Sequence, residues 1–469
     1  MTLRFLHFSD IHFGQERDDG GWAAFPDVRA EALTDIQRVQ NQGLIKGPAD
    51  AVLVTGDIAQ AGLEAEFKVA SEWLDQALEL ARCPPRAMRA VPGNHDVNLT
   101  RLNDQGLQTH NMLRNGEVDD AYAYLSALSG QVNNPIADKF VDYRGFAHAY
   151  GSDFTSDSNP MSVARYEMEG GPGIRLIGFS TVLISDRKDQ KGKLLLGANQ
   201  YQVSRERGFE DVVMMHHPLH WLKDQDRAET YLNSRARMVL TGHEHHPKLG
   251  KVEHDNGYQQ VRLAAGALTP PSAGLGYWYS YNWIEFDWLP SSEGRPQLKV
   301  TVYPRAWIPS ETRFGPDRER LASGEAIDFV LSCEPHLPPP EGATSIPSAL
   351  AMGAPIEIAN VVEVLQTEAT SDLRVPETDA VPEEVDDVES FAQLRFLFWR
   401  YLSRDQRVDA LISVGLVTER SRHRLPSFME QEAFAEAGDD PTLLASLWDL
   451  TMPHVPPDQC SPNPFKATS

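Results

Sequence analysis

Cysteine is scarce in this sequence. Cys83, Cys333 and Cys460 lie far apart in the 469-residue chain and have no metal-binding or redox spacing. Because their number is odd, they cannot form a complete disulfide framework, and a reducing cytoplasm is the expected location. Long apolar runs are also missing, since no segment approaches the roughly 18 apolar residues that a membrane helix needs. The N-terminus reaches charged residues too early for a signal peptide.

Basic residues are in deficit as well. The chain has 43 lysines and arginines against 67 aspartates and glutamates, which gives a net charge of −24. Binding of duplex nucleic acid depends largely on lysine and arginine contacts with phosphates, so extended contact with a duplex is not expected. A small nucleotide needs only a few local donors and remains compatible with this charge. Part of the acidity is local, because residues 366–389 contain nine acidic side chains and one arginine.

The chain nevertheless has enough apolar residues to bury a large core, at 41% hydrophobic and 9% aromatic. At this length two or three domains are expected. Short apolar runs alternate with helical stretches through the first half, which is typical of an α/β sheet architecture. We expect helices at 29–39 and 64–81, and strands at 3–8, 51–54, 89–91, 174–179, 212–215, 238–240, 259–264, 282–286 and 298–302.

Changes in composition predict three parts. Residues 1–332 form a first domain, in which segment 97–158 departs from the strand–helix rhythm and is expected to be a helical insertion. This insertion either caps a site or packs as an ordinary face. Residues 333–389 are rich in proline and acidic side chains, and they bury too little apolar surface to offset the entropy of ordering, which predicts a linker. Residues 390–469 carry apolar stripes at helical spacing.

Five short motifs place oxygen and nitrogen ligands together, four of them directly after apolar strands. They read Asp10-Ile11-His12, Gly56-Asp57, Gly93-Asn94-His95-Asp96, His216-His217-Pro218 and Gly242-His243-Glu244-His245. Residues two apart on a strand lie on the same side, so the first motif can direct a carboxylate and an imidazole at one ion. Taken alone, the first motif is better explained as a strand-end aspartate beside a surface histidine, and the other motifs can be turns, loops or exposed histidines. The complete mixed set suits Mn, Fe or Zn and contains too much nitrogen for a Ca site.

In this order the five motifs resemble the signature of the calcineurin-like metallophosphoesterases, over about residues 3–305. The resemblance implies an α/β fold, an αββα sandwich of two mixed sheets, with two divalent metal ions at the strand ends. It implies one ion held by Asp10, His12, Asp57 and His245, and a second held by the bridging Asp57 together with Asn94, His216 and His243. After Gly56-Asp57 the chain reads Ile58-Ala59-Gln60 in place of the acidic or aromatic pattern frequent in the family, so this motif does not indicate the substrate.

The implied chemistry is hydrolysis of a phosphoester. Two ions about 3.5–4 Å apart hold a hydroxide between them and clamp the phosphate oxygens. Because the leaving alkoxide needs a proton, we expect His95 to act as general acid, Asp96 to orient its ring and Asn94 to contact the phosphate. We expect a phosphodiesterase acting on a nucleotide-type substrate by metal-bridging hydroxide attack. A nuclease or phosphomonoesterase effector of a bacterial conflict system is the alternative enzyme, and a non-catalytic metal-binding scaffold is the alternative from another class.

Capping signals divide the last part of the chain into four short helices. Ser403 and Gln406 have the spacing of a capping box, Gly415 is a plausible helix stop, and Asp440-Pro441 opens a further helix. Residues 390–465 resemble the small death-like effector-associated domains of bacterial conflict proteins. The resemblance implies an interaction module for a protein partner, able to move independently of the first domain, and a purely structural bundle is the alternative.

Overall fold

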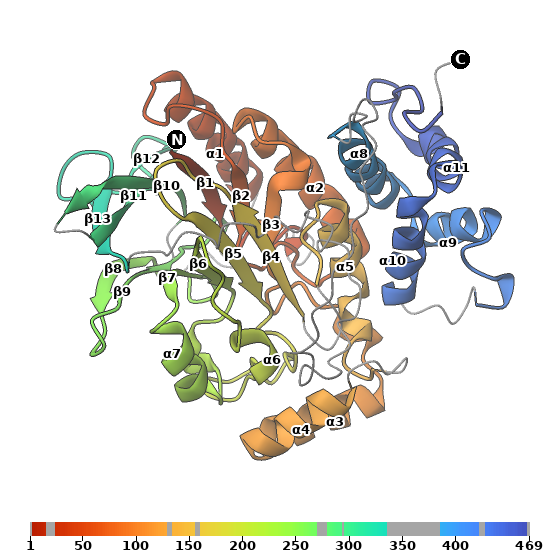
Figure 1. The fold of residues 1–469 in the computed structure, drawn as a ribbon, viewed down its shortest axis with the longest axis horizontal. Coiled ribbons are helices and arrows are strands. Elements are labelled where there is room, and N and C mark those ends of the chain that lie inside the picture. The colour runs from red at the N-terminus through yellow and green to blue at the C-terminus, as the bar shows by residue number, and fades with distance from the viewer. Residues whose placement is uncertain are drawn as a thin grey trace, which may run out of the picture.

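Two mixed β-sheets form the centre of the protein (Figure 1). The computed structural model describes residues 2–15, 24–128, 134–154, 160–269, 279–292, 295–334, 385–421 and 427–466. The first sheet has the order β12-β11-β10-β1-β2-β3, with β13 paired to β11. Its strands are β1 (Leu3–Phe8), β2 (Ala51–Val54), β3 (Met88–Ala90), β10 (Ser280–Ser292), β11 (Arg295–Ile308), β12 (Arg313–Pro316) and β13 (Ile327–Ser332).

The second sheet has the order β4-β5-β6-β7-β9-β8. Its strands are β4 (Met161–Tyr166), β5 (Gly173–Phe179), β6 (Phe209–Met215), β7 (Ala236–Thr241), β8 (Lys248–Glu253) and β9 (Gln259–Ala264). One hydrophobic cluster contains side chains of both sheets, including Phe5 from β1 and Met214 from β6, so the two sheets pack face to face. The expected two-sheet α/β fold is therefore confirmed.

Parallel pairing determines where the functional loops meet. In the first sheet β1 pairs in parallel with β2 and β2 with β3, while in the second sheet β5, β6, β7 and β9 pair in parallel. The carboxyl ends of parallel neighbours lie at the same edge of a sheet, and ligands of open α/β sheets bind beyond that edge. The loops that follow β1, β2, β3, β6 and β7 are therefore brought together.

Helices cover the outer faces of both sheets (Figure 1). The helices α1 (Ala24–Asn41) and α2 (Glu64–Leu80) bury apolar side chains against the first sheet, in one cluster with Leu6 and Phe8 of β1. The short helix α6 (Ala198–Tyr201) and α7 (Gln225–Leu232) contribute to a cluster on the second sheet. The central strands are therefore buried on both faces, which explains their continuous apolar runs.

The segment expected to be an insertion contains α3 (Asp104–Asn115), α4 (Val118–Leu128) and α5 (Val141–Ala149). The aromatic side chains of α5 pack on α2, since Phe146 is stacked on Phe67 with ring centroids 5.1 Å apart. Of the two roles expected for this segment, the packing of α5 supports an ordinary packing face.

The C-terminal helices are α8 (Val385–Tyr401), α9 (Arg404–Ser413), α10 (Ser427–Glu436) and α11 (Pro441–Thr451). The capping box of Ser403 and Gln406 is present, and Asp440 caps α11 by accepting from the backbone N–H groups of Thr442 and Leu443. Gly415 has a φ of 82° beyond the end of α9, as the stop signal predicts. Of the helices described, none is long and apolar enough to cross a lipid bilayer.

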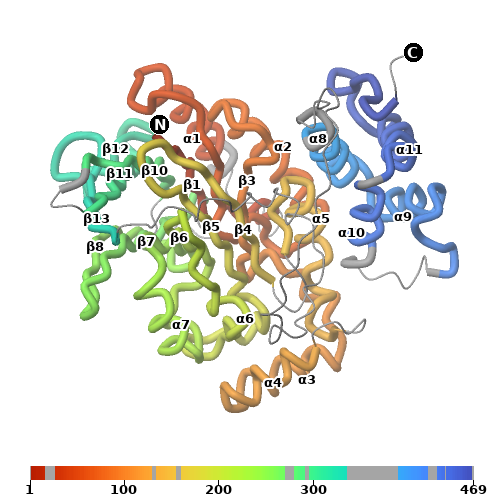
Figure 2. The backbone as a smooth tube through the Cα atoms, viewed as in Figure 1, coloured from red at the N-terminus to blue at the C-terminus, as the bar shows by residue number. Residues whose placement is uncertain are grey.

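The C-terminal helices are docked on the rest of the protein, beside α2 and α5 (Figure 2). Trp399 of α8 lies against the His148 ring of α5, with ring centroids 4.1 Å apart. Arg400 Nε lies 3.3 Å from Asp75 Oδ2 of α2, and Arg144 of α5 donates to Gln431 of α10. Independent movement was expected from the composition of the linker, most of which lies outside the described residues. The composition of a linker does not indicate which surface the following helices bury. Here the C-terminal helices bury apolar side chains in one cluster with those of α2 and α5.

Trp399→Ala should loosen this docking. The Trp399 side chain is 6% exposed and also contacts Phe434, with ring centroids 4.5 Å apart. Truncating a buried tryptophan costs about 3–5 kcal/mol, so the helices should unfold at a lower temperature by circular dichroism and become sensitive to limited proteolysis. Leu450→Ala on α11 is the control, because Leu450 is 37% exposed. Equal protease resistance of both variants and the wild type would contradict the docked arrangement.

Candidate metal centre

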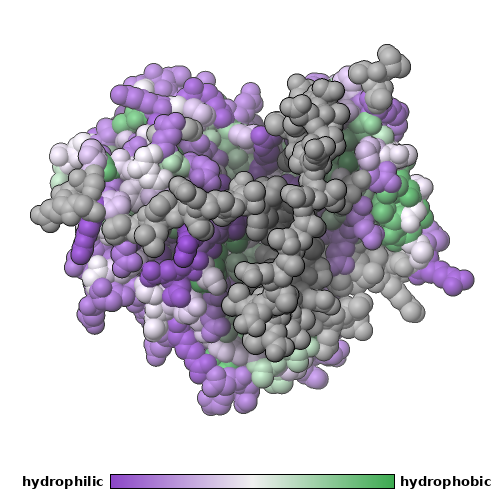
Figure 3. Space-filling model, viewed as in Figure 1, coloured by the Kyte–Doolittle hydropathy of each residue, from purple (hydrophilic) through white to green (hydrophobic). Residues whose placement is uncertain are grey.

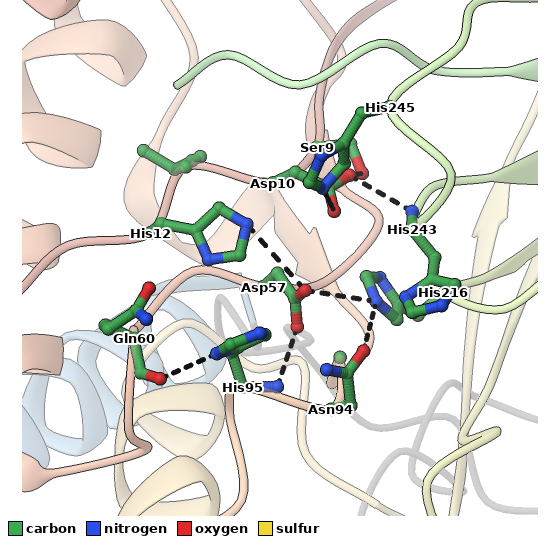
Figure 4. A network of polar contacts seen from close by, with 12 residues as sticks. Ser9, Asp10, His12, Asp57, Gln60, Asn94, His95, His216, His243 and His245 are labelled. Atoms are coloured by element: carbon green, nitrogen blue, oxygen red, sulfur yellow. Dashed lines mark hydrogen bonds and ion pairs between the residues drawn. The ribbon is translucent and has the colours of Figure 1, made fainter. Parts of the chain in front are cut away.

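The five motifs converge on one buried site at the carboxyl ends of the parallel strands (Figure 4). Residues from both sheets contribute, and every residue expected to bind metal is present there. From the first sheet, Asp10 and His12 follow β1, Asp57 follows β2, and Asn94, His95 and Asp96 follow β3. From the second sheet, His216 follows β6, and His243 and His245 follow β7. Asn94, His95 and His243 are partly exposed and the others are buried. The site is therefore partly open to solvent at these three residues.

Asp57 lies at the centre of the arrangement. Its Oδ2 is 3.3 Å from His216 Nε2 and 3.8 Å from His12 Nε2. His216 Nε2 is also 3.1 Å from Asn94 Oδ1. One carboxylate oxygen therefore faces imidazole nitrogens that are delivered by two different sheets.

Asp10 organises the other end of the site. Its Oδ1 lies 3.0 Å from His245 Nε2, and its Oδ2 accepts a hydrogen bond of 3.2 Å from the backbone N–H of His243. Potential ligand atoms of Asp10, His12 and His245 all lie within 4.8 Å of one another, as do those of Asp10, Asp57 and His216. Two overlapping sets of ligands thus share the two carboxylates.

The backbone at these residues adopts an unfavourable conformation. Asp10, His12, Asp57, His243 and His245 have φ angles of 54°, 51°, 54°, 70° and 55°. In the described part of the chain they are five of the seven non-glycine residues with positive φ. Such conformations cost about 1–3 kcal/mol each and persist where the surrounding structure enforces them, often at functional sites. The turns therefore aim these side chains at a stability cost that the packed sheets offset.

Two glycines of the motifs are required for close approach. A Cβ at Gly93 would lie 2.1 Å from Asp57 Oδ1 and 2.4 Å from Asp57 N. A Cβ at Gly242 would lie 2.2 Å from Ser9 Oγ and 2.9 Å from Asp10 Oδ2. Any larger residue at either position would displace a carboxylate of the site.

The charges of the site are balanced within the protein. Burial alone would raise the pKa of Asp57, but the neighbouring histidines His216, His95 and His12 together outweigh burial and hold that pKa well below its usual range. Burial would lower the pKa of His216, and the Asp57 carboxylate instead raises it to about 9. At His245, burial would likewise lower the pKa, but the Asp10 carboxylate raises it, and the pKa of His245 is raised overall. The buried carboxylates and the imidazoles of His216 and His245 thus shift one another's pKa towards the charged forms.

His12 tests whether the residues fit a metal ion. Burial lowers the pKa of His12 to about 3, so its ring is neutral at pH 7. Within the described residues neither Nδ1 nor Nε2 has a hydrogen-bond partner, which is rare for buried polar atoms. A neutral imidazole with an available lone pair is a preferred ligand of transition metals. The unpartnered ring and the adjacent carboxylates therefore fit a site for divalent metal.

The environment of His95 differs from the expected one. His95 Nδ1 lies 2.7 Å from the backbone carbonyl of Gln60, so Gln60, and not Asp96, fixes the ring. The Asp96 carboxylate accepts hydrogen bonds of 2.8 Å from the backbone N–H groups of Ile58, Ala59 and Gly93. The expected pairing of Asp96 with the His95 ring is therefore incorrect. Asp96 is adjacent in sequence, but its side chain turns back to join the two loops.

Several residues of the site left little trace in the sequence. Ser9 Oγ donates to Asp10 Oδ2, and the backbone carbonyl of Thr55 lies 2.8 Å from His216 Nδ1. Thr181 contacts the ring of His217, a residue that had no role expected from the motif to which it belongs. The position of Ser9 next to Asp10 was an available signal. Contacts made by main-chain carbonyls, or across distant loops, have no sequence signature.

A rim of polar and aromatic side chains lies beside His243. Glu244 Oε1 accepts from Lys191 Nζ and His220 Nε2, both at 2.8 Å, and from Trp221 Nε1 at 3.4 Å. The Trp221 ring lies edge-on to the His243 ring, with centroids 4.3 Å apart. Glu244 therefore ties two loops of the second sheet together next to the candidate metal ligands.

Comparison with known families agrees with this geometry. The profile of the calcineurin-like phosphoesterases matches residues 3–247, which is more than half of the chain. The chain therefore belongs to this family and is a metal-dependent phosphoester hydrolase. A second profile, the GTPase-associated adaptor domain, matches residues 390–452, which lie within the segment 390–469 that was expected to be an interaction module. None of the curated proteins matches the chain significantly.

Solved structures with some similarity include metal-dependent hydrolases. A dimetal phosphatase from Danio rerio is 14% identical with a TM-score of 0.35, over 70% of this chain and 98% of that one. A predicted phosphoesterase from Streptococcus pneumoniae is 12% identical with a TM-score of 0.26, over 70% and 98%. The NAD nucleotidase of Haemophilus influenzae is 12% identical with a TM-score of 0.30, over 68% of this chain and 54% of that one. Similarity at this level carries no information about the substrate.

Gly93→Ala should impair metal binding without unfolding the protein. The added Cβ would displace Asp57, and disturbing groups that orient metal ligands typically costs about 10–100-fold in metal affinity. Metal content after manganese loading, measured by mass spectrometry, checks this. Gly250→Ala is the matched control, because its Cβ would meet nothing within 4 Å. Undiminished manganese affinity of Gly93→Ala would mean that the position of Asp57 does not control the ions.

Proposed function

We propose that the site binds two divalent ions that share Asp57. The first ion would be held by Asp10, His12, Asp57 and His245, and the second by Asp57, Asn94, His216 and His243. The support is the position of Asp57 Oδ2, which faces His216 at 3.3 Å and His12 at 3.8 Å. The mixed carboxylate, amide and imidazole donors favour Mn, Fe or Zn.

The proposed reaction is hydrolysis of a nucleotide-type phosphodiester. The convergence of the five motifs on one buried site is the observation that carries the phosphoesterase activity. The rim supports the nucleotide-type substrate. Trp221 offers an aromatic ring beside His243, and Lys191 Nζ lies 5.6 Å from the centre of the Trp221 ring. A nucleobase can stack on an aromatic side chain, and an ammonium group can contact a second phosphate.

Bound ions would activate water and neutralise charge on the phosphoryl oxygens. The protein residues would orient the substrate and deliver a proton. Because His95 Nδ1 is directed at the Gln60 carbonyl, Nε2 is the ring nitrogen that remains for proton transfer. His95 would act as general acid towards the leaving group. Asn94 directs Oδ1 at His216 and can offer its amide N–H to a phosphate oxygen.

Asp57→Asn should remove most activity and weaken both ions. A neutral amide cannot balance two divalent charges, and Asp57 is the residue that both ligand sets share. Metal content by mass spectrometry and turnover of bis-nitrophenyl phosphate are the measurements. Retention of two tightly bound ions with near-normal turnover would refute the bridging assignment.

His95→Ala should retain both ions and lose on the order of 10²–10⁴ in rate, the usual contribution of a general acid. The loss should be smaller for a nitrophenol leaving group, which needs little protonation, than for an alkoxide leaving group. His254→Ala, a histidine between β8 and β9, is the control and should leave both rates unchanged. Equal losses on the two kinds of substrate would exclude the general-acid role.

A substrate panel separates the alternatives. Manganese-loaded protein would be offered cyclic nucleotides, single-stranded DNA and RNA, and phosphomonoesters. Preference for the single strands or the monoesters would favour a nuclease or a phosphomonoesterase. Binding of less than about one ion per chain, with no turnover, would favour the scaffold.

We also propose that residues 390–469 recruit a protein partner, with residues 1–332 as the catalytic domain and 333–389 as the linker. The matching adaptor family is described as GTPase-associated, which makes a GTPase the first partner to test. On the face seen in Figure 3, hydrophobic side chains gather on the C-terminal helices, while the sandwich is largely hydrophilic. Leu443 of α11 is partly exposed and Leu450 is exposed, so both are available for contact.

A further inference from the structure

His217 lies beside the candidate metal ligands and has no assigned role. It follows His216 at the end of β6 and is completely buried. Its ring lies 4.2 Å from the His243 ring between centroids, and 5.5 Å from the Trp221 ring. One ring nitrogen of each of His216, His217 and His243 lies within 4.8 Å of the other two.

Hydrogen bonds to Thr181 fix the tautomer of His217. Thr181 Oγ1 accepts a hydrogen bond of 3.1 Å from the backbone N–H of His217 and lies 2.9 Å from His217 Nδ1. Thr181 is itself completely buried, and in the described chain Nδ1 is the one acceptor within reach of its hydroxyl proton. A hydroxyl group has one proton to donate. The Thr181 hydroxyl therefore donates to Nδ1, and the ring proton of His217 is on Nε2.

The Nε2–H group of His217 is a donor without an acceptor. In the described part of the chain Nε2 is buried and has no hydrogen-bond partner. A buried donor of this kind is unfavourable unless a ligand completes it. A protonated Nε2 cannot also serve as a metal ligand, because its lone pair is occupied. An oxygen atom of a bound ligand would supply the acceptor that this Nε2–H group needs.

We propose that His217 Nε2–H donates a hydrogen bond to a non-bridging phosphoryl oxygen of the substrate, and that Thr181 is the positioning residue that fixes this tautomer. The inference rests on the proposed phosphoesterase function. It adds a neutral donor, from the second sheet, to the residues that contact the phosphoryl group. Product phosphate presents the same oxygens and is bound in the same way.

The test compares His217→Phe, which keeps a ring but removes the donor, with His217→Gln, whose amide N–H can replace Nε2–H. Manganese content, the inhibition constant of inorganic phosphate, and KM and kcat for bis-nitrophenyl phosphate are measured. His217→Phe should retain both ions and bind phosphate about ten-fold more weakly, as expected for loss of a hydrogen bond to a charged group. His217→Gln should recover most of this affinity.

Loss of an ion from His217→Phe would make His217 a metal ligand and overturn the proposal. Unchanged phosphate affinity in His217→Phe, with an active wild type, would overturn the donor role alone. A wild type that holds two ions but neither binds phosphate nor hydrolyses a phosphoester would overturn the proposed function and the donor role together.

A second measurement does not depend on the folding of a histidine variant. In wild-type protein labelled with ¹⁵N-histidine, the His217 signals should show a protonated Nε2 and an unprotonated Nδ1. For this measurement zinc replaces manganese, because manganese would broaden the signals. Addition of inorganic phosphate to the zinc-loaded protein should change the chemical shift of the Nε2–H proton. Thr181→Val should weaken phosphate binding without loss of metal. A proton on Nδ1 in the wild type would overturn the proposal.

Discussion

The buried carboxylate of Asp57 is the group around which the site is built. Its Oδ1 accepts a hydrogen bond of 2.8 Å from the backbone N–H of His95, while Oδ2 faces His216 and His12. A carboxylate that is 1% exposed has lost its hydration, so its charge has to be matched by neighbouring groups or ions. Matching it from both sides is feasible because the two sheets present their loops at a common edge. The two sheets thus hold the groups that surround the Asp57 carboxylate.

Holding Asp57 in place requires features that are unfavourable or neutral alone. The backbone of Asp57 has a φ of 54°, and Gly93 must lack a side chain so that its loop can approach. Asp96 then joins the two loops by accepting from Ile58 and Gly93. The cost of such strained turns is offset by strands that are buried on both faces and cannot shift. The rigid sheets therefore stabilise the strained loops that hold Asp57 in position.

The same loop connects the site to the C-terminal helices. Directly after the third motif, Asn98 donates to Asp142 at the start of α5, and Arg101 forms an ion pair of 2.7 Å with the same carboxylate. The other end of α5 holds His148, which packs against Trp399 of α8. The loop after β3 and the C-terminal helices are thus both in contact with α5. The helix α5 therefore links the C-terminal helices to the loop that carries the third motif.

The sequence by itself indicated an α/β architecture, because buried parallel strands leave continuous apolar runs. The five motifs, four of them directly after such runs, indicated the family by resemblance, and with it the two-sheet fold and the residues gathered at the site. It did not reveal β4, β8, β12 and β13, since partly exposed edge strands such as β8 have no continuous apolar run. Only the tertiary structure decided that Gln60 orients His95, that Thr181 contacts the ring of His217, and that α8 docks on α5. These contacts join residues distant in sequence, in part through main-chain carbonyls that every residue possesses, so no local pattern encodes them.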